Sequence, residues 1–338
     1  MPEKLINLYK KIFKANPEHI SELKAHSSEH KLFRLSSKNF SCLGVFNENS
    51  KENIAFVKFT EFFRKAKLPV PEVYIVSGDN KYYLEEDLGN LSLFDFIKKF
   101  NKTRAKKVNK YYETALNDLI EFQIKGREVI DFKYCYQTKK FGYKQIYIDL
   151  KKFEDYCLPL ILRNKFNKLH KSALIKEMLN IVNDEKNLFF MYRDFQPRNI
   201  MINKDKLYYI DFQSGRLGPM QYDVASLLFS GSIIIDNVGR EELIEYYINS
   251  LNKRIHINKE LFIKNFYPIA FIRILQMLGS YGYNYRITGN YEFKYKTDNA
   301  FENLKTMKEK MKNRKLKFIL EDLLTNKNEI ITHTLKRR

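Results

Sequence analysis

The chain has 338 residues, with 60 Lys and Arg against 40 Asp and Glu, which gives a formal net charge of +20. This length allows two lobes with a sizeable core, and an apolar fraction of 44% is typical of a folded globular protein. No apolar run approaches the roughly 20 residues that a membrane-spanning helix requires, and residues 1–20 lack a signal-peptide core. We therefore expect a cytoplasmic protein without membrane insertion.

The basic charge and the cysteines indicate no special partner. Lysines are spread along the whole chain, and Lys, Asn, Ile and Tyr are abundant together, as a genome-wide compositional bias would produce. The 27 Phe and 23 Tyr show no nucleic-acid recognition signature. Cys42, Cys135 and Cys157 lack metal-ligand spacing. We expect a solvated basic surface, densest near Lys336–Arg338, with no dedicated nucleic acid partner and no structural zinc; the oligomeric state stays open.

The N-terminal part of the chain is predicted to be rich in strands. Apolar residues within 5–13 share one face of an amphipathic helix. Short β-branched and aromatic runs then surround one helical stretch, Glu52–Lys67, which ends before two prolines because proline disfavours helix in the residue before it. Tyr82–Leu84 is a predicted strand. These elements form an expected N-terminal nucleotide-binding lobe, residues 1–88.

Beyond residue 88 the periodicity is mostly helical, which predicts a larger helical lobe over 89–338 that carries catalysis and substrate binding. One exception stands inside it. Apolar residues 200–202 and 207–210 flank the turn-forming segment Asn203–Lys206, which predicts a β-hairpin. The fold class expected from these patterns is α+β.

The hairpin places two metal-ligating side chains together. Asn199 precedes its first strand and Asp211 follows its second, so the two residues face each other at the open end. Neighbouring strands lie roughly 4.8 Å apart, and an amide oxygen with a carboxylate at that spacing suits Mg²⁺. Asp194 lies on the loop just before and is placed to orient an attacking hydroxyl and accept its proton. The three residues together predict phosphoryl transfer from ATP with Mg²⁺.

Spacing strengthens this interpretation. A carboxylate followed five positions later by Asn matches the protein-kinase catalytic loop, and Asp211 falls where the metal-binding Asp of the next loop belongs. Taken singly, Asp194 and Asn199 are ordinary turn formers and Asp211 an ordinary strand-end cap. Their order around a hairpin favours catalysis.

The segments Tyr192–Asn199 and Ile210–Leu228 resemble the aminoglycoside phosphotransferase and choline kinase superfamily, and within it most resemble the bacterial N-acetylmuramate/N-acetylglucosamine anomeric kinases. The likeness continues in Leu68–Val73, Leu84–Gly89 and Leu275–Gly279. The resemblance implies a two-lobed protein-kinase-like fold, with a small strand-rich N-lobe and a larger helical C-lobe.

The resemblance also implies roles for individual residues. The backbone carbonyl of Glu85 and the backbone amide of Asp87 would face adenine at the hinge between the lobes. Asp223 would brace the catalytic loop.

The chain departs from the kinase pattern around the phosphates. Tyr192 replaces the usual His of the catalytic loop, and residues 26–30 and 41–45 offer neither a Gly-rich loop nor a strand lysine. Arg34 is the nearest cation able to replace that lysine, with Glu52 as its expected partner. The alternative is a surface arginine and a glutamate that interacts with the helix dipole.

The sequence therefore predicts an ATP- and Mg²⁺-dependent phosphotransferase whose partner is a small-molecule hydroxyl acceptor, with an amino sugar or N-acetylhexosamine as first choice. Choline-like or aminoglycoside acceptors are the alternative. A nucleotide-binding pseudokinase or regulatory adaptor is the alternative outside enzymes, supported by the missing lysine and Gly-rich loop and opposed by the intact Asp194, Asn199 and Asp211.

Overall fold

The computed structural model describes residues 2–23, 30–38, 40–100, 103, 105–161, 168–183, 188–289 and 292–327. Residues 26–29, part of the segment that the resemblance aligns with a kinase Gly-rich loop, and the basic end 336–338 lie outside the described residues. The chain forms two compact units. Unit 1 consists of Met1–Lys139 and Pro197–Arg216, and unit 2 of Lys140–Gln196 and Leu217–Arg338.

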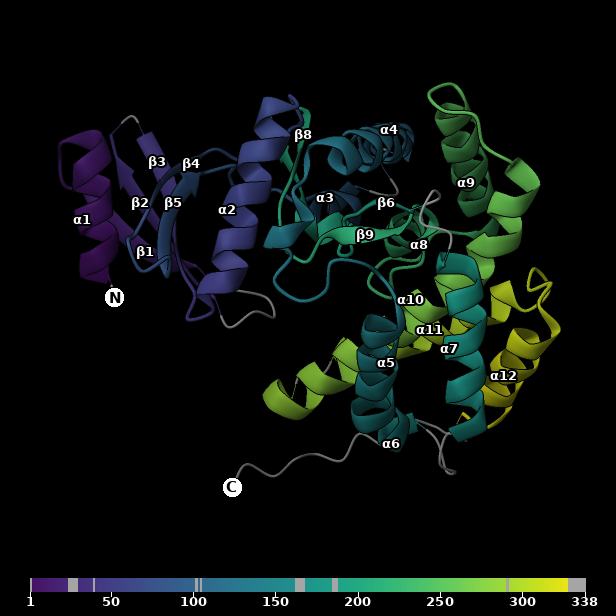
Figure 1. The fold of residues 1–338 in the computed structure, drawn as a ribbon. Coiled ribbons are helices and arrows are strands. Elements are labelled where there is room, and N and C mark those ends of the chain that lie inside the picture. The colour runs from purple at the N-terminus through teal and green to yellow at the C-terminus, as the bar shows by residue number, and fades with distance from the viewer. Residues whose placement is uncertain are drawn as a thin grey trace. The chain divides into compact units, whose positions relative to one another are not determined.

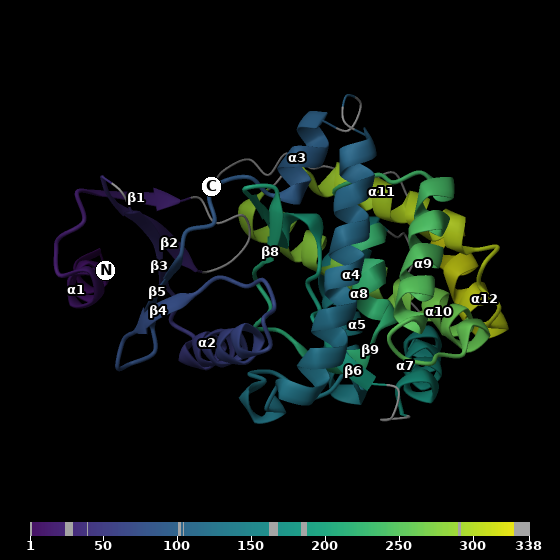
Figure 2. The ribbon, with the colours of Figure 1, turned by 90° about the horizontal axis from the view of Figure 1, so that it is seen from above.

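Unit 1 is built on a five-stranded antiparallel sheet with the order β1-β2-β3-β5-β4. Its strands are β1 (His19–Leu23), β2 (Lys31–Ser37), β3 (Phe40–Phe46), β4 (Val73–Val76) and β5 (Tyr82–Glu86). Helices α1 (Pro2–Phe13) and α2 (Ser50–Lys65) lie on opposite faces of this sheet (Figures 1 and 2).

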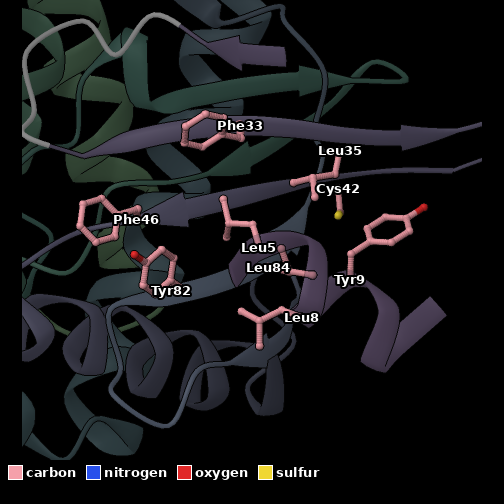
Figure 3. Close-up of a cluster of buried hydrophobic side chains, with 9 residues drawn as sticks. All are labelled: Leu5, Leu8, Tyr9, Phe33, Leu35, Cys42, Phe46, Tyr82 and Leu84. Carbon is pink, nitrogen blue, oxygen red and sulfur yellow. The ribbon is translucent and has the colours of Figure 1, made fainter. Parts of the chain in front are cut away.

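The face of the sheet under α1 is a hydrophobic core, shown in Figure 3. Alternate residues of a strand point to one face, so every second residue of β2, β3 and β5 contributes to it. The cluster comprises Leu5, Leu8, Tyr9, Phe33, Leu35, Cys42, Phe46, Tyr82 and Leu84. A Cβ on Gly44 would lie 2.8 Å from Leu35 Cδ1, so glycine permits this close packing. The amphipathic helix predicted at the N-terminus is confirmed.

Helix α2 covers the opposite face of the sheet and packs against helical elements that follow in the chain. The elements after the sheet are α3 (Leu93–Phe100), α4 (Ala105–Val129) and the 3₁₀ turn η1 (Phe132–Tyr134). Phe63 of α2 packs edge-on against Phe122 of α4, with ring centroids 5.0 Å apart. The compact units therefore differ from the lobes expected from the sequence, because aromatic packing joins α4 to α2. The functional division at residue 88 stays a prediction.

The predicted hairpin is confirmed. After the 3₁₀ turn η4 (Pro197–Asn199), strand β7 (Ile200–Asn203) pairs antiparallel with β8 (Lys206–Tyr209). The two residues between the strands, Lys204 and Asp205, have φ of 49° and 60°. Two consecutive positive φ values match the right-handed twist of the strands, as in a type I′ hairpin turn.

Unit 2 is mostly helical and also contains the two-stranded sheet of β6 (Leu188–Met191) and β9 (Arg216–Pro219), whose first residue belongs to unit 1. Its helical elements are α5 (Tyr143–Lys152), the π-helical turn η2 (Phe153–Cys157), α6 (Leu158–Ile161), α7 (Lys168–Val182), α8 (Gln221–Leu228), α9 (Asn237–Asn252), α10 (Lys259–Thr288), α11 (Glu292–Met307) and α12 (Arg314–Thr325).

Helix α10 is the centre of unit 2 and contacts α5, η2, α7, α8 and α11 (Figure 1). By length and composition it could cross a membrane, but 78% of its most apolar window is buried, as in the core helix of a soluble protein. Pro268 lies inside this continuous helix. A Cβ on Gly282 would lie 2.4 Å from the backbone oxygen of Tyr156, so glycine allows α10 to approach η2 closely.

Candidate active site

The open end of the hairpin brings Asn199 and Asp211 into direct contact, as predicted from the sequence. Asn199 Nδ2 donates a hydrogen bond of 2.9 Å to Asp211 Oδ2. The backbone holds this arrangement, because Ile210 N donates to the carbonyl of Asn199 at 3.0 Å. Both residues belong to unit 1, and each lies at one of the two ends of the same hairpin.

Asp211 has a left-handed backbone, with φ of 68°. Asp tolerates this region better than most residues, but the conformation still needs support from its surroundings. The next residue supplies it: Phe212 is fully buried, stacks on Phe56 of α2 at 4.9 Å and meets Phe63 edge-on at 5.2 Å. Packing under α2 therefore fixes the turn that presents the Asp211 carboxylate.

Gln213 connects Asp211 to the first turn of α2. Its Nε2 donates to Asp211 Oδ1 at 2.7 Å and to Glu52 Oε1 at 3.2 Å. Its Oε1 is buried and has no hydrogen-bond partner. A buried oxygen without a donor is costly and often marks a site for a cation or water. The sequence interpretation gave Gln213 no role, because a glutamine after a strand carries no signal of its own.

Glu52 is held by His30, Asn47 and Gln213. Its Oε1 lies 3.5 Å from His30 Nε2, and Asn47 Nδ2 donates to its Oε2 at 3.3 Å. Burial raises the pKa of Glu52, but the hydrogen bonds from His30, Gln213 and Asn47 outweigh burial, so the pKa lies below its ordinary value. Glu52 therefore stays charged beside the hairpin end.

The expected pairing of Arg34 with Glu52 is wrong. The Arg34 guanidinium instead binds Asp87 with both arms: Nε donates to Oδ2 at 2.6 Å and Nη2 to Oδ1 at 2.8 Å. The cause is strand register, since Arg34 is opposite Leu43 and Leu43 is opposite Glu85, so Asp87 shares the Arg34 face. Burial raises the pKa of Asp87, yet the bonds from Arg34 lower it overall.

Glu85 points to the same face of the sheet and is buried. Its Oε2 has no hydrogen-bond partner. Burial first, and then the nearby charges of Asp87 and Glu86, raise the pKa of Glu85 from 4.5 to about 8. With this pKa the carboxyl is mostly protonated near neutral pH, which avoids the cost of a buried negative charge.

Asp194 lies in unit 2, on a loop whose backbone is held by Asp223. The two oxygens of Asp223 accept hydrogen bonds of 2.8 Å from the backbone N–H of Tyr192 and of Arg193. Asp223 is fully buried. Arg193 is left-handed, with φ of 79°, so the residue before Asp194 needs this support.

Two arginines complete the surroundings of this loop. The buried Arg193 guanidinium binds Asp149 of α5 with both arms, at 2.7 Å and 3.2 Å. The Asp149 carboxylate is therefore occupied by this arginine. Arg273 of α10 lies with Nη2 3.6 Å from Asp194 Oδ1 and is also buried. No sequence signal pointed to Arg273, which lies in an apolar helix far along the chain.

Comparisons with known proteins match part of the chain to a family of enzymes. Residues 147–255 match the model of the phosphotransferase enzyme family. The chain is 26% identical over 186 residues to an N-acetylmuramate/N-acetylglucosamine kinase of Pseudomonas aeruginosa, which covers 51% of this chain and 48% of that protein. It is 22% identical over 223 residues to protein LicA of Haemophilus influenzae, covering 62% of each. The matches thus span less than two thirds of the length of either relative.

Solved structures show the same fold. Choline kinase LicA from Streptococcus pneumoniae aligns with a TM-score of 0.62 and 12% identity, over 90% of this chain and 98% of that one. A spectinomycin phosphotransferase crystallised with ADP and spectinomycin aligns with a TM-score of 0.54 and 15% identity, over 95% and 98%. The expected α+β kinase-like fold, with a strand-rich N-terminal part and a larger helical C-terminal part, is confirmed.

Proposed function

We propose that this chain, which contains a phosphotransferase-family domain, is an ATP- and Mg²⁺-dependent phosphotransferase that acts on a hydroxyl of a small molecule. The observation that carries the proposal is the direct contact of Asn199 with Asp211 at the end of the hairpin, five residues after Asp194 along the chain.

The metal ligands in this proposal are Asn199 and Asp211. An amide oxygen and a carboxylate oxygen suit a hard cation, and the orphaned Gln213 Oε1 adds a third oxygen beside them. Among the described residues no group of three His, Cys, Asp or Glu side chains could hold a metal, so the remaining ligands would be phosphate oxygens and water. A bound Mg²⁺ would neutralise charge on the transferred phosphoryl group.

Nucleotide binding is assigned to the face of the sheet that α2 covers, with the Glu85 carbonyl and the Asp87 amide as the proposed adenine contacts. Arg34 remains a proposed nucleotide-binding residue, but its two-armed bond to Asp87 means that it also orders the segment after β5. Glu52 acts through Gln213, because this amide joins it to the metal-ligating Asp211.

Asp194 is the proposed base. A carboxylate within reach of the acceptor hydroxyl orients the oxygen for attack and takes its proton, which contributes typically about 10² to 10⁴ in rate. The hydrogen bonds to Asp223 keep the loop backbone fixed. The Arg273 guanidinium, 3.6 Å away, places an opposite charge beside the Asp194 carboxylate.

The proposed acceptor is an amino sugar or N-acetylhexosamine, which the 26% identity to an N-acetylmuramate/N-acetylglucosamine kinase supports. The test is ADP formation from ATP and Mg²⁺ against a panel of amino sugars, amino alcohols and aminoglycosides. Turnover that depends on a sugar acceptor is expected. Turnover of choline alone would contradict the sugar acceptor and favour a choline-like one. Nucleotide binding without any acceptor-dependent turnover would favour the adaptor interpretation.

A further inference from the structure

A row of polar side chains follows one face of α10 away from Asp194. Residues three or four apart share a helix face, and Arg273, Gln276, Ser280 and Tyr283 have this spacing. Arg273, beside Asp194, donates through Nη1 to Gln276 Oε1, and Gln276 Nε2 donates to Ser280 Oγ at 3.3 Å. Hydrogen bonds therefore connect Arg273, Gln276 and Ser280, and this row begins beside the proposed base.

Lys152, the last residue of α5, reaches the far part of this row. Its Nζ donates to Ser280 Oγ at 3.3 Å and lies 4.8 Å from the ring centroid of Tyr283. Ser280 follows Arg273 by seven residues, which is about 10 Å along a helix axis. Two cations, Arg273 and Lys152, thus stand about two helical turns apart on one polar surface.

The charge of Lys152 is poorly compensated. The Lys152 side chain is half-buried, and burial is the largest cause that lowers its pKa below the ordinary value, although Asp149 and Asp194 act in the opposite direction. The acidic side chains of α5 and η2 near it are paired with other cations: Asp149 with Arg193 at 2.7 Å, Glu154 with Lys171 at 2.6 Å and Asp155 with Lys151 at 2.9 Å. A half-buried ammonium with these contacts is suited to bind an anion.

We propose that Lys152 is a specificity-determining residue that binds an anionic group of the acceptor, so that the acceptor is a hydroxyl compound carrying a carboxylate. This inference rests on the proposed function, since it places the acceptor hydroxyl at Asp194. A carboxylate at Lys152 would gain charge-assisted hydrogen bonds from Nζ and from the Ser280 hydroxyl. A cationic acceptor would instead place its charge near the Lys152 ammonium, which disfavours choline and aminoglycosides. Among the acceptors proposed above, it also disfavours amino sugars with a free amine and favours N-acetylhexosamines.

The proposal differs in a measurable way from a purely structural role. A lysine that only packs on Tyr283 would contribute equally to every acceptor through the stability of α5 and α10. A lysine that binds the carboxylate of the acceptor changes the ratio between acceptors that carry this group and acceptors that lack it.

The experiment compares N-acetylmuramate, N-acetylglucosamine and glucosamine as anionic, neutral and cationic acceptors that share a hexosamine ring. The kcat/KM of each is measured for the wild type, for Lys152→Met and for Lys152→Arg. Lys151→Met is the matched control, because Lys151 is the exposed neighbouring residue and pairs with Asp155. Binding of each sugar without nucleotide is measured by calorimetry on the same variants.

We expect the wild type to prefer N-acetylmuramate, and Lys152→Met to reduce the ratio of N-acetylmuramate to N-acetylglucosamine by at least about tenfold, the effect of losing a hydrogen bond to a charged group. Lys152→Arg should recover part of the ratio, and Lys151→Met should leave it unchanged. A ratio that is equal in wild type and Lys152→Met, or a preference for glucosamine, would overturn the inference.

The two proposals fail separately. Sugar turnover with no dependence on Lys152 would refute the role of Lys152 and leave the phosphotransferase function standing. Lys152-dependent binding of N-acetylmuramate without any turnover would support the anion site and refute the proposed reaction. Absence of both sugar binding and sugar turnover would overturn both.

Discussion

The support that Asp223 gives to the loop before Asp194 is worth testing quantitatively through the variant Asp223→Asn. The carboxylate accepts two backbone hydrogen bonds, from Tyr192 and Arg193, and is fully buried. An asparagine offers one acceptor oxygen and turns an NH₂ group toward the second N–H. One charge-assisted bond, worth about 1.5 to 3 kcal/mol, is lost, and the other becomes neutral, so we expect a loss of about 3 kcal/mol in the stability of unit 2.

For a unit of this size, about 3 kcal/mol corresponds to a fall in Tm of roughly 6 to 12 °C. Thermal unfolding followed by circular dichroism measures this shift. The matched control is Asp236→Asn, an exposed residue that caps α9 by accepting from Gly239 N at 2.9 Å. Asparagine is as good an N-cap as aspartate, so this control should leave Tm unchanged.

Loss of the hydrogen bonds to Asp223 should also lower the rate of the reaction. Arg193 has φ of 79° and precedes the proposed base, so relaxation of its backbone would displace Asp194. We expect kcat of Asp223→Asn to fall by more than about tenfold at a temperature where it stays folded, since small misplacement of a catalytic group is costly. A Tm within about 2 °C of the wild type, together with unchanged kcat, would refute this reasoning.

Two further variants test the hairpin end and the buried carboxyl of β5. Asp211→Asn should remove the Mg²⁺-dependent part of ATP affinity, because Asp211 is the only full negative charge assigned to the metal; calorimetry with and without Mg²⁺ measures this, and equal Mg²⁺ dependence in both proteins would contradict it. Glu85 stays protonated up to a pKa of about 8 in the folded protein but ionises near 4.5 when unfolded, so stability should fall as pH rises from about 4.5 to 8. Between pH 5.5 and pH 8.5, the loss of stability in Glu85→Gln should be smaller than that of the wild type by more than about 1 kcal/mol, measured from urea unfolding; identical pH profiles would refute the raised pKa.

Local patterns in the sequence predicted the parts of the fold that local chemistry decides. The hairpin followed from turn-forming residues between two apolar runs, and its pairing alone is enough to bring Asn199 close to Asp211. The helix at residues 2–13 followed from the spacing of its apolar residues. In contrast, β1 was missed because its five residues are mostly exposed and lack apolar alternation; its antiparallel partner, β2, holds it through the backbone.

Contacts between segments that are distant in the chain could not be predicted from the sequence. The pairing of Arg34 with Asp87, 53 residues away, depends on the registers of two strand pairs, whereas the sequence favoured the nearer helix-start residue Glu52. The contact of Lys152 with Ser280 joins residues 128 apart and depends on the close approach that glycines permit between α10 and η2. The contacts of the charged side chains around the site are therefore the part of the structure that could not be predicted from a single sequence.

The most direct test of the central claim is acceptor-dependent ADP release by Asp194→Asn beside the wild type. The assay uses saturating Mg²⁺-ATP and each sugar of the acceptor panel, with nucleotide affinity measured on the same preparations. Asn keeps the shape of the side chain and removes its capacity to take a proton. The account predicts a kcat lower by at least about 10²-fold with unchanged ATP affinity. A kcat close to that of the wild type would contradict it.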